Sequence, residues 1–293
     1  MNTSKTYLAH LMAIITVVIW GTTFVSTKVL INNGLTPTEI LIYRFTIAYL
    51  CIWFISPKKV WANTLKDECL FILIGLTGGS LYFLAENTAL KYTMASNVGL
   101  IISTTPVITA LIQYLVYKKS KPGKLMILGS ITALLGVAFV VFNGSFVLQL
   151  SPIGDILTLL AGLMWALYCI IFDRLGNRYP TVFITRKLFI YGVITILPVL
   201  LIEPIAIETE RLLRPVVILN LLFLGLIASM LCYIMWNLSV KRIGTLHTTN
   251  YLYITPLITL LTSAIIIDEP ITWIAIIGCI LILGGVYIAE KGE

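Results

Sequence analysis

Residues 105–109 read Thr-Pro-Val-Ile-Thr, and residues 255–259 read Thr-Pro-Leu-Ile-Thr. The same offset of 150 residues relates Asn-Thr-Ala-Leu-Lys at 87–91 to Asn-Leu-Ser-Val-Lys at 237–241. Further pairs at similar offsets are Pro122 with Pro270, Leu135-Gly136 with Leu283-Gly284, and Trp20 with Trp165. These pairs predict two related halves, residues 1–143 and 153–293, joined by a linker at 144–152.

The composition of both halves is that of a membrane protein. Of the 293 residues, 59% are hydrophobic and 11% are charged, against roughly 45–50% and 25% in globular proteins. The mean hydropathy is +0.99, and apolar runs repeatedly exceed the about 18 to 20 residues that cross a bilayer. This composition excludes a soluble enzyme and a disordered chain.

Charged and turn-forming residues divide the chain into ten apolar spans. The spans are predicted near residues 8–27, 37–56, 69–89, 95–117, 124–142, 153–172, 182–202, 215–237, 246–267 and 272–289. Runs of this length are typical of helices in lipid, whereas strands of a membrane β-barrel are about 10 residues long and alternate in polarity. The predicted fold class is therefore an all-α integral membrane protein with ten transmembrane helices. Because five spans per half is an odd number, the halves enter the membrane from opposite sides and form two inverted five-helix repeats.

The basic residues give the orientation of these spans. With the N-terminus inside, fifteen of the 20 Lys and Arg residues fall in inner segments: Lys5, Lys58, Lys59, Lys66, Lys118, Lys119, Lys121, Lys124, Arg174, Arg178, Arg186, Lys187, Lys241, Arg242 and Lys291. The outer segments hold Lys28, Lys91, Arg211 and Arg214, and Arg44 lies within a span. An excess of Lys and Arg marks cytoplasmic loops, so both termini are expected in the cytoplasm. We assign the net charge of +7 to this topology, and no nucleic-acid partner is expected.

Several short pieces, taken in order, carry a family resemblance. They are Trp20-Gly21-Thr22-Thr23-Phe24, Arg44-Phe45, Ala89-Leu90-Lys91-Tyr92 leading to Thr105-Pro106, and Glu269-Pro270 before Gly278 and Gly284. Together they resemble the EamA-type branch of the drug/metabolite transporter superfamily over almost the whole chain. The resemblance implies ten helices, a central cavity walled by spans 1, 3, 4, 6, 8 and 9, and export of small metabolites. Members usually carry an acidic residue after span 4, where this sequence has Lys118-Lys119, so any role of that acid is absent or confined to Glu269.

Arg44 and Glu86 are the charged residues that stand out at membrane depth. A charge at membrane depth is costly and normally faces a cavity or a partner. Both residues lie toward the outer face, so one interpretation is a fixed ion pair or snorkelling to water. The other is functional: Glu86 titrates and couples transport to protons, or Arg44 or Glu86 holds a charged end of a zwitterionic substrate.

Aromatic and polar residues at helical spacing are candidates for lining a substrate cavity. They are Trp20, Thr23, Tyr82, Glu86, Asn97, Trp165, Tyr168, Tyr233, Trp236, Asn237, Asn250 and Tyr253. The alternative for each is packing, or hydrogen bonding to a neighbouring helix. In the third span, Gly75, Gly79, Tyr82 and Glu86 are predicted to share one face, which borders either a cavity or a closely packed helix.

Pro106 and Pro256 occupy matching positions in mid-span. Each removes an internal hydrogen bond and is expected to kink its helix. Paired kinks suit helices that rock, although static bending around the bundle is the alternative.

Metal and cofactor chemistry is not expected. His10 and His247 are the two histidines, and the five cysteines form no CxxC pair, so no metal site is predicted. The sequence also lacks the GxxxxGK[ST] phosphate-binding loop, which argues against ATP as the energy source.

The sequence thus predicts a secondary transporter, not an enzyme, that exports small metabolites, foremost amino acids or related compounds, by alternating access. The alternatives are an uncoupled facilitative carrier for another small organic solute and a lipid-handling membrane protein. The expected location is the bacterial plasma membrane, with a small-molecule substrate and the lipid bilayer as partners. A monomer is sufficient for this mechanism, and the sequence leaves the oligomeric state open.

Overall fold

The computed structural model describes residues 3–57, 61–117, 123–142, 152–205, 208–266 and 273–291. Four of the predicted features lie outside these residues: the linker up to residue 151, the Lys118-Lys119 loop, the Glu269-Pro270 loop and the side chain of Asn97.

The first half is entirely helical in its described part. Its elements are α1 (Thr3–Asn32), α2 (Pro37–Ile55), α3 (Leu65–Gly75), η1 (Leu76–Ser80), α4 (Leu81–Tyr92), α5 (Ala95–Ile102), α6 (Thr105–Tyr117) and α7 (Lys124–Phe142). Local sequence sets the start of α2, where Thr36 and Glu39 form a reciprocal capping box and Pro37 occupies the first turn. This combination satisfies backbone amides that have no partner within the helix.

The second half repeats the pattern. Its elements are α8 (Pro152–Gly176), α9 (Thr181–Ile196), η2 (Leu197–Leu201), α10 (Thr209–Leu212), α11 (Pro215–Leu222), η3 (Phe223–Leu231), α12 (Cys232–Ile243), α13 (Thr245–Asn250), η4 (Tyr251–Ile254), α14 (Thr255–Ile266) and α15 (Trp273–Glu290). Gly244 separates α12 from α13 with φ of 87°. This is left-handed backbone that glycine adopts without steric cost, so the chain reverses in a single residue.

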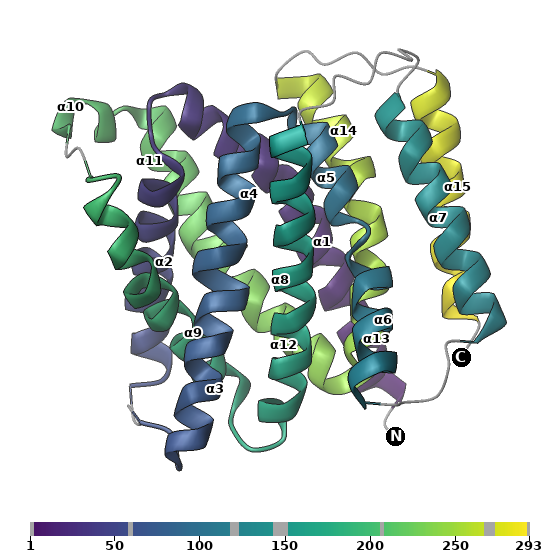
Figure 1. The fold of residues 1–293 in the computed structure, drawn as a ribbon, viewed down its shortest axis with the longest axis horizontal. Coiled ribbons are helices and arrows are strands. Elements are labelled where there is room, and N and C mark those ends of the chain that lie inside the picture. The colour runs from purple at the N-terminus through teal and green to yellow at the C-terminus, as the bar shows by residue number, and fades with distance from the viewer. Residues whose placement is uncertain are drawn as a thin grey trace.

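The predicted ten membrane-crossing segments are confirmed. In the described part of the chain, seven helical segments are long and apolar enough to cross a membrane. The three apolar stretches Thr105–Leu115, Lys124–Gly136 and Ile276–Ala289 complete the ten. Both chain ends lie at the same end of the bundle (Figure 1), as an even number of crossings requires.

The two halves pack against each other through equivalent contacts, because corresponding helices of each half contact the other half in the same way. Helix α1 packs against α12 and α14 of the second half, and α8, its counterpart, packs against α4, α5 and α6 of the first. In the same way α2 packs on η3, and α9 packs on η1. The structure is therefore two inverted five-helix repeats whose core lies between the halves.

Helices α7 and α15 form a separate pair at one side of the bundle (Figure 1). A Cβ atom added at Gly129 would lie 2.3 Å from the backbone nitrogen of Ala289, and one added at Gly285 would lie 2.4 Å from that of Ala133. Small residues let the backbones of membrane helices approach this closely. The last helix of each repeat thus packs mainly on its counterpart, and the pair meets the rest of the bundle through a small cluster with Tyr253 and Leu260.

Candidate functional site

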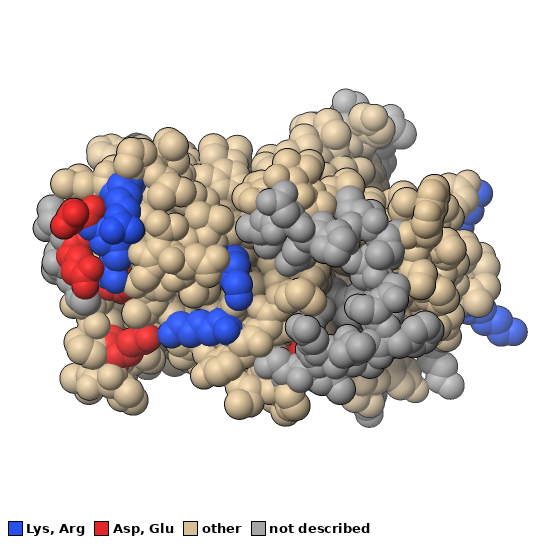
Figure 2. Space-filling view, turned by 90° about the horizontal axis from the view of Figure 1, so that it is seen from above, with Lys and Arg blue, Asp and Glu red and all other residues tan. Residues whose placement is uncertain are grey.

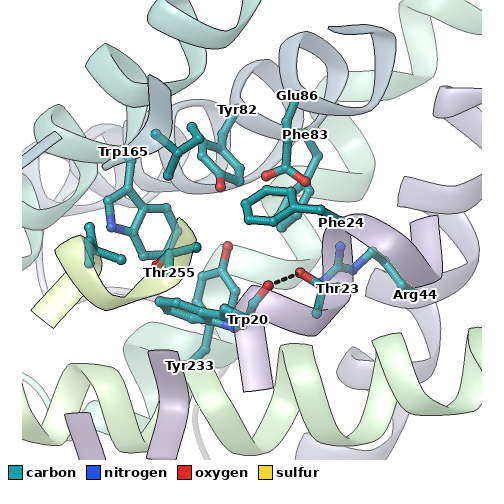
Figure 3. A pocket seen from close by; sticks show the side chains of 12 residues that line it. Trp20, Thr23, Phe24, Arg44, Tyr82, Phe83, Glu86, Trp165, Tyr233 and Thr255 are labelled. Atoms are coloured by element: carbon teal, nitrogen blue, oxygen red, sulfur yellow. Dashed lines mark hydrogen bonds between the residues drawn. The ribbon is translucent and has the colours of Figure 1, made fainter. Parts of the chain in front are cut away.

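A small cavity lies at the centre of the bundle, between the two halves (Figure 3). Its volume is about 30 Å³, and about 10–15 Å³ on this measure is enough for one water molecule. The lining residues come from both halves: Trp20, Thr23, Phe24, Arg44, Tyr82, Phe83, Glu86, Ile102, Trp165, Tyr233, Leu252 and Thr255. They belong to spans 1, 3, 4, 6, 8 and 9, which the family resemblance implied, and to span 2 through Arg44.

Aromatic rings make up most of the cavity wall. Trp20 of α1 and its repeat partner Trp165 of α8 meet edge to face, with ring centroids 5.0 Å apart. The ring of Tyr233 lies 5.7 Å from Trp20 and 5.5 Å from Trp165, and that of Tyr82 lies 5.1 Å from Trp165. Edge-to-face and tilted arrangements at these distances are the favourable ones. The wall therefore suits the apolar part of a small organic molecule.

Two opposite charges face this aromatic cavity without forming an ion pair with each other. Arg44 is 1% exposed and Glu86 is 2% exposed, and both point into the cavity (Figure 3). The Arg44 guanidinium donates through Nε to the Ser229 hydroxyl at 3.0 Å and lies 4.1 Å from the centroid of the Phe83 ring. Among the ion pairs of the described residues none joins Arg44 to Glu86.

Several polar atoms around the cavity have no hydrogen-bond partner among the described residues. They are Nη1 of Arg44, Nε1 of Trp165 and Oγ1 of Thr255, all from residues that line the cavity. A buried donor without a partner costs about 1–3 kcal/mol, and more if it is charged. These donors are therefore available to a bound polar molecule.

In the third span, the prediction that the two glycines share one face with Tyr82 and Glu86 is wrong, because the helix is not regular. Tyr82 and Glu86 line the cavity, but added Cβ atoms at Gly75 and Gly79 would meet backbone atoms of Gly192 on α9, at 2.9 and 3.1 Å. The π-helical segment η1 (Leu76–Ser80), which contains Gly79, separates Gly75 at the end of α3 from Tyr82 and Glu86 in α4. An extra residue in a turn rotates the next part of the helix by about 100°. The glycines thus serve close packing, whereas Tyr82 and Glu86 border the cavity.

The remaining predicted lining residues lie behind the cavity wall. The Tyr168 hydroxyl donates to Oδ1 of Asn237, and Nδ2 of Asn237 donates to Thr185 at 3.0 Å. Trp236 is fully buried, with its ring 5.0 Å from that of Trp20. Asn250 and Tyr253 are buried as well, and none of these five residues lines the cavity.

Five lining residues were not among the sequence candidates: Phe24, Phe83, Ile102, Leu252 and Thr255. Phe24 follows Trp20 by one helical turn, so helical spacing could have predicted that it lines the cavity. Thr255 opens the repeated Thr-Pro motif. Phe83 and Ile102 look like lipid-facing or core side chains in the sequence, so their role depends on tertiary packing.

The helices of spans 4 and 9 break next to the repeated prolines. A turn at Ser103–Thr104 separates α5 from α6, and Pro106 stands second in α6. In the second half η4 separates α13 from α14, and Pro256 stands second in α14. Proline is tolerated in the first turn of a helix because the amides there have no partner within the helix. Each span thus consists of two half-helices that meet beside the cavity.

Comparison with known proteins identifies the family to which this chain is similar. The EamA-like transporter family matches residues 7–142 and 152–290. An uncharacterized transporter of Archaeoglobus fulgidus is 28% identical over 97% of this chain and 98% of its own length. A probable amino-acid metabolite efflux pump of Escherichia coli is 25% identical over 96% of this chain and 94% of its own. One crystal structure superimposes with a TM-score of 0.74 at 16% identity, covering 99% of this chain and 98% of the other, a likeness of fold alone.

The bundle of inverted repeats around a central cavity defines a multi-pass membrane protein with the architecture of a carrier. The chain belongs to the EamA-like transporter family, with one matched region in each half. It is a transporter and not an enzyme.

Proposed function

We propose that the protein exports a small zwitterionic metabolite, an amino acid or a related compound, through the central cavity. The observation that carries the proposal is the pair of unjoined opposite charges, Arg44 and Glu86, in one aromatic cavity. A guanidinium with a free Nη1 suits a carboxylate, and a carboxylate suits an ammonium group. The name of the Escherichia coli relative, a probable amino-acid metabolite efflux pump, supports the same substrate class.

Transport proceeds by alternating access between the repeats 1–143 and 153–293, which the linker 144–152 connects. A cavity of about 30 Å³ is too small for an amino acid, so loading requires the halves to move apart. Inverted repeats provide such a motion, because either end can open while the other stays closed.

Polar contacts between the halves support this mechanism at one end of the bundle. On the side of the chain termini, Arg178 pairs with Asp67 at 2.8 Å and Lys187 pairs with Glu68. These contacts join α3 of the first half to the α8–α9 region of the second. Opening this end requires them to separate.

A second set of contacts closes the opposite end. Arg211 pairs with Glu39 at 3.1 Å, and the Thr38 hydroxyl donates to Glu203 at 2.7 Å. Acidic and basic side chains gather on the part of this end that carries α10 (Figure 2). Polar contacts thus join the two halves at each end of the bundle, and water can replace them when that end opens.

The location and orientation belong to the same proposal. The excess of basic residues in the segments on the side of the termini supports a cytoplasmic N-terminus and C-terminus in a bacterial plasma membrane. The cavity lies within a single chain, so a monomer is sufficient for transport.

Solute counterflow in proteoliposomes tests the function. Vesicles loaded with neutral, aromatic and small polar amino acids in turn should accumulate the labelled form of at least one of them. Protein-free vesicles and vesicles with Arg44→Gln serve as controls. Absence of exchange for the whole panel with a folded protein would overturn the amino-acid assignment. Exchange that ignores an imposed pH gradient would favour an uncoupled facilitative carrier.

A further inference from the structure

A second pocket lies between α2 and α9, at the end of the bundle that carries the chain termini. Its volume is about 150 Å³, several times that of the central cavity. Tyr49 and Trp53 of α2 form one wall, Trp61 forms the rim, and Arg186 and Tyr191 of α9 form the other wall. The pocket is separate from the central cavity, since the two share no lining residue.

Arg186 is the unusual group in this pocket. It is 2% exposed, and its guanidinium lies 4.9 Å from the centroid of the Trp53 ring. One guanidinium nitrogen, Nη1, donates to the backbone carbonyl of Ser56 at the end of α2. The other, Nη2, has no hydrogen-bond partner among the described residues. A buried guanidinium with a free donor is suited to an anion, above all to the oxygens of a phosphate group.

The neighbouring charges leave this guanidinium uncompensated. Lys187, the next residue, pairs with Glu68, and the Tyr191 hydroxyl donates to the same carboxylate. Among the ion pairs of the described residues, none includes Arg186. Among the described residues, the pocket therefore carries one net positive charge, centred on Arg186.

The rest of the wall indicates where the anion comes from. Ile190 and Ile194 follow Arg186 at intervals of four residues, so the three share one face of α9, and Ile194 is 47% exposed. Trp61, 69% exposed, stands at the rim, where tryptophans mark the membrane interface. A free anion would gain nothing from the isoleucines, whereas a phospholipid would lay an acyl chain along them.

We propose that this pocket binds an anionic phospholipid of the inner leaflet, with the headgroup phosphate on Arg186 and an acyl chain along Ile190 and Ile194. Basic pockets between membrane helices on the cytoplasmic side are suited to such headgroups. The bound lipid would join α2 of the first repeat to α9 of the second. The proposal does not depend on which solute the central cavity carries.

The first test uses the wild-type protein in detergent and needs no variant. Native mass spectrometry with phosphatidylglycerol, phosphatidylcholine or inorganic phosphate should show one retained phosphatidylglycerol, with at most weak retention of phosphatidylcholine. Equal retention of the two lipids would overturn the proposal. Displacement of phosphatidylglycerol by inorganic phosphate at similar concentration would instead assign the pocket to a free anion.

Two variants then test Arg186 in different ways. Arg186→Gln should weaken phosphatidylglycerol binding about tenfold, the effect of losing one charge-assisted hydrogen bond. Ile190→Glu keeps the guanidinium but supplies a carboxylate one helical turn away, and it should also abolish the preference for the anionic lipid. The matched control is Arg242→Gln, an exposed arginine at the same end of the bundle, which should bind lipid as the wild type does.

The two variants together keep the result interpretable. Arg186 also bonds the end of α2, so Arg186→Gln is compared at equal helicity and equal monodispersity. If it fails to fold, Ile190→Glu carries the test alone. Unchanged phosphatidylglycerol preference in a folded variant of either kind would refute the role of Arg186.

Discussion

The hydroxyl of Tyr233 donates to the backbone carbonyl of Gly78 at 2.7 Å, so that α12 of the second repeat is bonded to the π-helical segment η1 of the first. A matching bond runs the other way, from Nε1 of Trp20 on α1 to the carbonyl of Ala228 in η3, at 2.8 Å. The two π segments occupy equivalent places in the third span of each repeat. Both donors line the central cavity, so the backbone irregularities hold the cavity wall in place from both halves.

Removal of one of these bonds should loosen the contact between the repeats. We expect Tyr233→Phe to destabilise the protein by about 1–2 kcal/mol, because the Gly78 carbonyl would remain buried without its partner. The measurement is the thermal unfolding midpoint of the purified protein in detergent. Tyr7→Phe is the matched control, since the Tyr7 side chain is exposed, and its midpoint should equal that of the wild type. Equal midpoints for both variants would show that the Tyr233 bond carries no net stability.

Arg44 should govern affinity for the carboxylate of the substrate. Loss of a charge-assisted contact weakens binding by about tenfold to a hundredfold, so Arg44→Gln should raise KM for counterflow by that factor. Arg44→Lys should recover part of the loss, because a lysine keeps the charge but lacks the planar fork.

The control for Arg44 is a change of substrate. A decarboxylated amine analogue, if transported, should be handled alike by the wild type and by Arg44→Gln. If Arg44→Gln reduced transport of both substrates equally, Arg44 would have a structural role in the cavity, through its hydrogen bond to Ser229, and no role in recognising the carboxylate.

Glu86 is the candidate for proton coupling. If it exchanges a proton during the cycle, export by the wild type should accelerate when the outside is made acidic, and export by Glu86→Gln should not respond. The measurement is counterflow with and without an imposed pH gradient. Glu208→Gln is the control, because that carboxylate is 65% exposed and remote from the cavity. An unchanged pH response in Glu86→Gln would eliminate the coupling role.

Alanine substitutions should have opposite effects on stability at a closely packed glycine and at a glycine with open space around it. An added Cβ at Gly75 would lie 2.8 Å from the backbone carbonyl carbon of Tyr191, so Gly75→Ala must push α3 away from α9. We expect a loss of about 1–3 kcal/mol, the usual cost of overpacking. At Gly284 nothing lies within 4 Å of the added atom, so Gly284→Ala should instead gain about 0.5–1 kcal/mol from helix propensity. Thermal midpoints that shift in the same direction would contradict this assignment.

Length, apolar runs and the 150-residue repeat determined the fold class from the sequence alone. Lipid provides no hydrogen-bond partners for the backbone, so apolar runs of this length must be helices. The odd number of spans per repeat then required the inversion. Aromatic residues at helical spacing also predicted much of the cavity, since Trp20, Tyr82, Trp165 and Tyr233 all line it.

Only the tertiary structure decided which polar residues meet. The π segment η1 turns Gly75 away from the face of Tyr82, and no local signal in the sequence marks that extra residue. The Tyr168 hydroxyl donates a hydrogen bond to Asn237 behind the cavity wall. Arg44 and Glu86, by contrast, both line the cavity without forming an ion pair with each other. Periodicity fixes the face of a helix only while the helix stays regular, and hydrogen-bond partners depend on distances between segments remote in the chain. The sequence therefore determined the helices and their topology, and packing between the repeats decided the site.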